Sequence, residues 1–140
     1  MAAHNVIITD EGKAMTFGRN QFGQLGLDNT ATKEIPTVAP ALENMNVIAA
    51  ACGRNHTVFL TDTGTVYACG DNRSGQCGVG NLQPNILTPT RINYRGPPIV
   101  KVRAFFIPST TLISVCYKHH FKCNCNILVL REFYSFYEHI

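Results

Sequence analysis

The chain has 140 residues, of which 45% are hydrophobic and 15% charged, and its formal net charge is +3. This length and composition indicate one globular domain, and the lack of a signal-peptide pattern predicts free thiols for the six cysteines. There is no run of five Lys or Arg and no apolar run of about 18 residues, which excludes a basic stripe for nucleic acid and a membrane-spanning helix.

The sequence contains an internal repeat. The 25 residues that begin at His4 align with the 25 that begin at His56, a period of 52, and ten aligned positions are identical. The matches include a T-D-x-G element and a loop of the form G-x-N-x-x-G-Q-x-G. A fixed period near 50 residues is typical of repeat architectures, so each motif is best interpreted as part of a repeated unit.

Each repeat predicts four short strands. In the second copy, residues 56–60 form a β-rich run, T-D-T-G closes a tight turn, and residues 65–69 return. A glycine-rich loop then leads to a strand that begins with proline, predicted over 36–39 in the first copy and 89–93 in the second. The small-residue run Val47–Cys52 leads into the next histidine. This pattern predicts an all-β chain, a partial β-propeller of about two four-stranded blades.

The segment ACGRNHTVFLTDTGTVYACGDNRSGQCGVG resembles the regulator of chromosome condensation repeat, whose pattern joins G-x-x-H-[ST] to G-x-N-x-x-G-Q-L-G. FGRNQFGQLG matches the same loop one repeat earlier, and ALENMNVIAAACGRNHT and INYRGPPIVKV look most like the mitotic paralogue in the family. The resemblance covers about residues 4–101. We interpret its motif positions as structural: His4, Gly12, Gly18, Asn20, Gly23, Gln24, Gly26, Gly53, His56, Gly64, Gly70, Asn72, Gly75, Gln76 and Gly78.

Five of these positions carry specific expectations. Gly64 should have a positive φ between two antiparallel strands, because a tight turn favours glycine there. Gln24 or Gln76 should hydrogen-bond the backbone of its loop, and His4 and His56 should pack between blades rather than act as bases.

The resemblance implies a seven-bladed propeller that serves as a non-enzymatic protein-interaction module without cofactor, metal or membrane. Family members bind small GTPases, chromatin or cytoskeletal partners through loops on two faces. The founding member is a nucleotide exchange factor for Ran, and the mitotic paralogue is associated with spindle organisation and Rho-type GTPase signalling. A nuclear or cytoplasmic location without direct base readout is implied. Because the chain holds only a part of such a ring, we expect it alone to be marginally stable, to self-associate through exposed blade faces and not to catalyse exchange.

An alternative function is a dimeric, retroviral-type aspartic protease, because Asp62-Thr63-Gly64 resembles a catalytic aspartate signature. Such an enzyme needs two carboxylates that share one proton. The repeat argues against this reading, since Asp10 occupies the equivalent corner in the first copy and each aspartate then belongs to its own turn.

The composition changes near Lys101–Val102, which predicts a boundary between a repeat region, 1–101, and a divergent tail, 102–140. All eleven glycines lie at or before Gly96, and the tail shows neither a clear period nor turn signals, so we expect it to be irregular and foreign to the family. A zinc-binding tail is a further alternative, because five residues in it have suitable side chains: Cys116, His119, His120, Cys123 and Cys125. Their spacing does not match a zinc-finger pattern.

Overall fold

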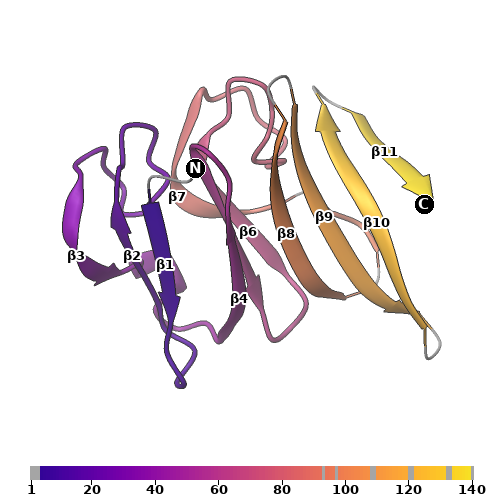
Figure 1. The fold of residues 1–140 in the computed structure, drawn as a ribbon, viewed down its shortest axis with the longest axis horizontal. Coiled ribbons are helices and arrows are strands. Elements are labelled where there is room, and N and C mark those ends of the chain that lie inside the picture. The colour runs from indigo at the N-terminus through magenta and orange to yellow at the C-terminus, as the bar shows by residue number, and fades with distance from the viewer. Residues whose placement is uncertain are drawn as a thin grey trace.

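The computed structural model describes residues 4–92, 94–96, 98–107, 110–119, 122–131 and 134–139, and it describes side chains as far as Val102, Lys101 excepted. The described residues form three antiparallel sheets that lie side by side, as Figure 1 shows. The expected all-β partial propeller is confirmed, with one sheet of three strands and two of four.

The first two sheets repeat with the period seen in the sequence. The first has the order β1 (His4–Ile8), β2 (Ala14–Gly18), β3 (Lys33–Val38). The second has the order β4 (Val47–Cys52), β5 (His56–Thr61), β6 (Val66–Asp71), β7 (Asn85–Arg91). Strands β5, β6 and β7 each begin 52 residues after β1, β2 and β3, so the two sheets are equivalent blades.

The outer strands are longer than predicted. Both β3 and β7 start several residues before their proline, which lies inside the strand as Pro36 or Pro89. Each strand is the last in its sheet order, where one side of the backbone has no strand partner and proline is tolerated. A short 3-10 helix, η1 (Pro40–Leu42), follows β3 and buries Leu42; the repeat pattern did not predict it.

The tail differs from the expectation. Its described residues form β8 (Ile99–Ile107), β9 (Thr110–His119), β10 (Lys122–Arg131) and β11 (Tyr134–His139), which pair in that order. The prediction of an irregular tail is therefore wrong. Its β-branched and aromatic residues suit strands although they do not alternate regularly with polar ones. Strand β8 begins 52 residues after β4 and runs across the predicted boundary at Lys101–Val102. That the residues after this boundary are foreign to the family stays a prediction.

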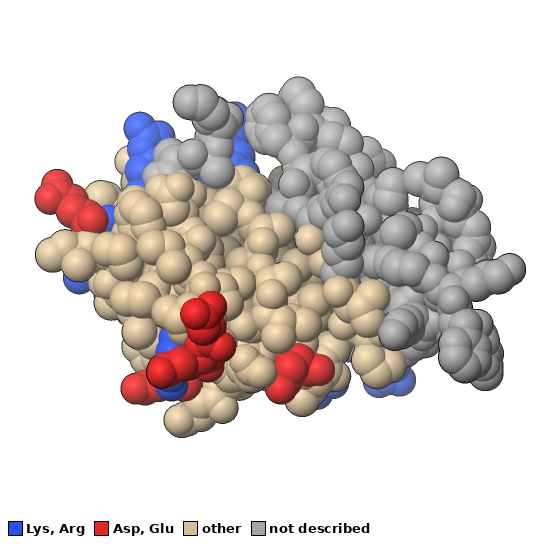
Figure 2. Space-filling model, turned by 60° about the horizontal axis from the view of Figure 1, so that its bottom comes forward, with Lys and Arg blue, Asp and Glu red and all other residues tan. Residues whose placement is uncertain are grey.

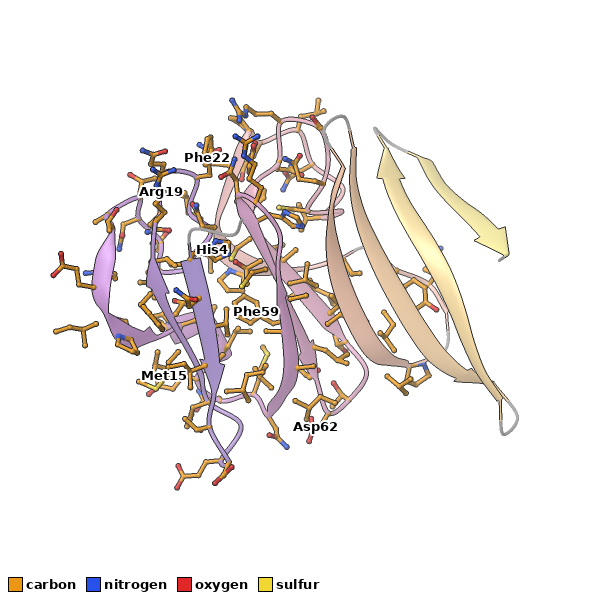
Figure 3. The ribbon with its side chains drawn as sticks, in the orientation of Figure 1. His4, Met15, Arg19, Phe22, Phe59 and Asp62 are labelled. Carbon is orange, nitrogen blue, oxygen red and sulfur yellow. The ribbon has the colours of Figure 1, made fainter. Side chains whose placement is uncertain are left out.

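The core lies between neighbouring blades. Phe59 on β5 is fully buried in a cluster that joins both sheets, and Figure 3 places it between β1 and β4. The equivalent position on β1, Ile7, is 44% exposed, because no sheet precedes β1 in the structure. Burial of this strand position therefore depends on a neighbouring blade. Full burial of one large apolar side chain stabilises a protein by roughly 1.5–3 kcal/mol.

Candidate interaction surface of the repeated loops

Two faces of the blades are defined by strand direction. The loop face comprises the ends of β2, β4 and β6, with loops 19–32 and 72–84 and turn 53–55. The hairpin face comprises turns 9–13 and 62–65 at the opposite ends of the strands. Figure 3 shows Arg19 and Phe22 on the loop face and Asp62 on the hairpin face.

The two long loops have the same internal bonds. The Asn20 side chain donates to the carbonyls of Asn29 (2.8 Å) and Ala31 (3.0 Å), and accepts from the Leu25 N–H (3.0 Å). Fifty-two positions later, Asn72 donates to Asn81 and Gln83 and accepts from Cys77. Asn20 is fully buried and Asn72 nearly so. In each blade one side-chain amide therefore makes three hydrogen bonds to the backbone of its own loop, which satisfies buried polar groups.

The glutamines hold the preceding turn of each loop. Gln24 Oε1 accepts from the Phe22 N–H at 3.0 Å, and Gln76 Oε1 accepts from the Ser74 N–H at 2.9 Å. The expected bond from glutamine to loop backbone is confirmed at both positions. Five glycines of the two loops have positive φ, Gly23, Gly26, Gly75, Gly78 and Gly80, and so do Gly18 and Gly70 near the ends of the preceding strands.

His4 links the first blade to the second. Its Nε2 lies 2.7 Å from the Thr57 hydroxyl, which donates to the Gln24 carbonyl at 2.5 Å. Because the hydroxyl has one proton, His4 is the donor to it and Nε2 carries the hydrogen. Burial lowers the pKa of His4 to about 4, so the ring is neutral at pH 7.

His56 occupies the equivalent position in the second blade. It is 2% exposed, and Gly53 leaves room for its ring, since a Cβ at Gly53 would meet the imidazole at 1.9 Å. Burial, and the neighbouring His4, lower the pKa of His56 to about 4. Both histidines are therefore packed, neutral groups rather than bases poised near pH 7. Sequence reasoning did not assign a role to Thr57, although the repeat pattern has a serine or threonine directly after its histidine, which is the position of Thr57.

The hairpin turns join each blade to the next. Gly64 has a φ of +77°, as expected, and lies between β5 and β6. Its carbonyl accepts from the Ile99 N–H at 3.1 Å, and Gly12 accepts from the Val47 N–H in the same way one repeat earlier. A Cβ on Gly64 would lie 2.8 Å from Pro98 Cα, so the close approach also requires glycine.

Asp62 lies exposed in the Gly64 turn. Its carboxylate accepts a hydrogen bond from the side-chain amide of Asn46 at 3.2 Å. The aligned Asp10 is also exposed and lies in the turn between β1 and β2. A hairpin corner bonded to an amide does not provide the shared proton of a protease dyad.

Arg73 connects the two loops and was not singled out by the sequence. Its Nε and Nη2 donate to the two oxygens of Asp71, both at 2.8 Å, and its guanidinium lies 4.8 Å from the centroid of the Phe22 ring. Asp71 is nearly buried, and burial alone would raise its pKa. The bonds and charge of Arg73 outweigh that effect and hold the pKa of the carboxyl below its usual value.

The cysteines with described side chains, Cys52, Cys69 and Cys77, are free thiols, as predicted. Burial raises the pKa of Cys69 and Cys77, so both stay protonated and unreactive at neutral pH. No group of three metal-ligating side chains occurs where side chains are described. The five zinc candidates have side chains outside that part: Cys116, His119, His120, Cys123 and Cys125. Among the described residues, no helix has the length and apolarity needed to cross a membrane.

Comparison with known proteins identifies the repeats. The model of the regulator of chromosome condensation (RCC1) repeat matches residues 11–60 and 63–104. The chain is 52% identical over 101 residues to Protein RCC2 homolog of Danio rerio and 48% identical to Protein RCC2 of Mus musculus. These matches cover 72% of this chain but only about a fifth of each relative, 20% and 19%. RCC2 is the paralogue that the sequence motifs were expected to resemble, and that likeness is confirmed.

A more distant relative and the solved structures extend the comparison. The X-linked retinitis pigmentosa GTPase regulator of Mus musculus is 50% identical over 78 residues, 56% of this chain and 8% of that protein. Human WBSCR16 has a TM-score of 0.81 at 16% identity, covering 96% of this chain and 35% of that one. Prp20p from Saccharomyces cerevisiae has a TM-score of 0.73 at 19% identity, covering 91% and 31%. The fold and the matched repeats agree, and the chain belongs to the regulator of chromosome condensation (RCC1) repeat family.

Proposed function

We propose that the chain is a non-enzymatic protein-interaction segment of an RCC1-type propeller and that a small GTPase binds its loop face. The observation that carries this proposal is a constant loop frame with different outward residues. Asn20 and Gln24 recur as Asn72 and Gln76 with the same bonds. Variable side chains on a rigid frame are typical of binding loops, whereas a catalytic group would need a fixed chemical partner.

The outward positions differ in charge and size between the two loops. The first loop has Gln21 and Phe22 where the second has Arg73 and Ser74, and the exposed Arg19 corresponds to the nearly buried Asp71 at the end of β6. Relatives support a regulatory partner. One is named a GTPase regulator, and the solved Prp20p structure is described with binding properties to Gsp1p and histones. Chromatin proteins are the second proposed class of partner. The proposal also includes a nuclear or cytoplasmic location and roles in mitosis and in the cytoskeleton.

Binding is tested with the chain fused to a monomeric carrier and a panel of purified small GTPases, each nucleotide-free, with GDP and with a GTP analogue. We expect micromolar binding of at least one GTPase. The double variant Gln21→Arg/Phe22→Ser gives the first loop outward residues of the second and keeps Asn20 and Gln24. It should weaken binding about tenfold or more without lowering the melting temperature by more than a few degrees. Absence of binding to every GTPase and to histones would contradict the proposal.

Self-association through exposed blade faces stays a prediction, and Ile7 on the open side of β1 supports it. The chain alone should not accelerate nucleotide exchange, because it spans only a fifth of its RCC2 relatives. Sedimentation and a fluorescent-nucleotide release assay measure these two properties.

Asp62→Asn tests the protease alternative. We expect this variant to keep the stability and partner binding of the wild-type chain, because Asp62 is exposed and, among the described residues, its carboxylate accepts a bond only from the exposed amide of Asn46. Peptidase activity is measured on the purified chain with and without pepstatin. A pepstatin-sensitive activity that disappears in Asp62→Asn would establish the protease and remove the interaction module as the main function.

A further inference from the structure

Arg73 is held in one geometry although its side chain is 59% exposed. Its guanidinium makes two hydrogen bonds to Asp71 and lies over the Phe22 ring. An exposed arginine ordinarily loses much rotamer freedom when it binds a partner, and that cost reduces affinity. Here the fold has already fixed the side chain. Hot spots of protein interfaces are enriched in arginine and aromatic residues, and a fixed arginine beside an aromatic ring fits that description.

This arrangement is not part of the repeat. The equivalents of Asp71, Arg73 and Phe22 in the other loop are Arg19, Gln21 and Ser74, which cannot form the same cluster. The bonds that hold the loops themselves come from asparagine and glutamine in both blades. The cluster is therefore an addition to the loop frame, and it joins the loops of two blades, with Arg73 as its most exposed member.

The charge around Arg73 favours a negative partner. Loops 19–32 and 72–84 and turn 53–55 contain three arginines, Arg19, Arg54 and Arg73, against one acidic residue, Asp28. The nearly buried Asp71 ends β6 next to loop 72–84. The hairpin face has a different balance, with acidic residues in both turns. Figure 2 turns that face toward the reader and shows acidic side chains on it, with basic ones along both its upper and its lower rim.

We propose that the loop face binds a carboxylate-rich protein segment, with Arg73 as the preorganised anchor and Arg19 as a second contact. Two of the five N–H groups of Arg73 are used by Asp71, which leaves donors for a partner carboxylate. Nucleic acid is the weaker candidate. The guanidinium occupies one face of Phe22, which a base would otherwise stack on, and the loops contain no lysine. This inference rests on the proposed interaction function and names its partner chemistry.

The probe is a fluorescein-labelled octaglutamate peptide, measured by anisotropy with the carrier-fused chain at about 0.05 M salt, where charge contacts are weakly screened. Octaglutamine and an eight-residue oligothymidylate are the comparison probes. We expect octaglutamate to bind most tightly. Arg73→Lys keeps the positive charge but loses the planar guanidinium and its stacking on Phe22, so it should weaken octaglutamate binding about tenfold. Phe22→Leu should also weaken octaglutamate binding, because leucine has no ring to hold the guanidinium in place.

Arg91→Lys is the matched control, because Arg91 is exposed at the hairpin end of β7, and it should bind octaglutamate like the wild-type chain. Equal binding by Arg73→Lys and wild type would reduce the effect to net charge and overturn the inference. Tighter binding of the oligothymidylate, or no binding of octaglutamate, would also overturn it. If a GTPase still binds in those cases, the proposed function stands without this anchor. If neither the GTPase panel, histones nor octaglutamate bind, both proposals fail.

Discussion

Replacing Gly70 with alanine is expected to remove a large part of the stability of the chain. Gly70 is the penultimate residue of β6 and has a φ of +111°, a conformation that L-residues rarely adopt. An added Cβ would lie 2.4 Å from the Asn55 carbonyl oxygen and 2.6 Å from His56 Cα. Both obstacles are backbone atoms, so relief would require moving the β4–β5 turn and the buried histidine after it.

The expected cost of Gly70→Ala is about 4 kcal/mol, the sum of conformational strain and displaced backbone. This is a large part of the roughly 5–15 kcal/mol that stabilises an ordinary domain. Urea unfolding followed by circular dichroism measures it, and the midpoint should fall by about 2 M or more.

Gly80→Asp is the matched control for this substitution. Gly80 has a φ of +76° and is exposed, and its equivalent in the first repeat is Asp28, which adopts a φ of +58°. Aspartate is therefore accepted at this left-handed position, and we expect a loss of less than about 1 kcal/mol. A Gly70→Ala chain as stable as Gly80→Asp would show that the β4–β5 turn is not fixed by the contact between Gly70 and Asn55.

The part of the site that could be predicted from the sequence is the part that repeats. Gly64, Asn20 and Gln24 have copies 52 residues away, and a copied residue in a turn or loop indicates a backbone requirement that each blade must meet by itself. The side-chain bonds of Asn20 and Gln24 are local, within eleven residues, so the pattern contains the information needed to expect them.

Contacts between blades could not be predicted in the same way. The bond from His4 to Thr57 spans 53 positions, and the contact of Arg73 with Phe22 joins two loops whose equivalent residues are different. Such pairs depend on how two sheets pack, which a single sequence does not specify. The strands of the tail were missed for another reason: a run such as TTLISVCY has strand-forming residues but no period and no turn signal.

Lowering the pH from 7 to 4 is expected to destabilise the chain through its two buried histidines. Burial lowers the pKa of His4 and of His56 to about 4, whereas an unfolded histidine titrates near 6.5. Between these values the unfolded chain binds more protons than the folded chain, so the free energy of unfolding must fall as the pH falls through this window. Above about pH 7 both states are neutral at these rings, and the effect vanishes.

Each histidine shift corresponds to about 3 kcal/mol once both states are protonated, so the pair can remove most of the stability of a small domain. Urea midpoints measured from pH 7.5 to pH 4.5 follow this loss. His4→Gln and His56→Gln should each be less stable than wild type at pH 7, because they lose packing, but should show a shallower decline with acid. The hydrogen-bonded carboxyl of Asp71 acts in a separate window, since its pKa is lowered and its contribution disappears only as the pH falls below the usual range of an aspartate. A stability that stays constant between pH 7 and pH 5 in the wild-type chain, or that declines as steeply in both variants as in the wild-type chain, would show that the two histidines do not cause the acid destabilisation.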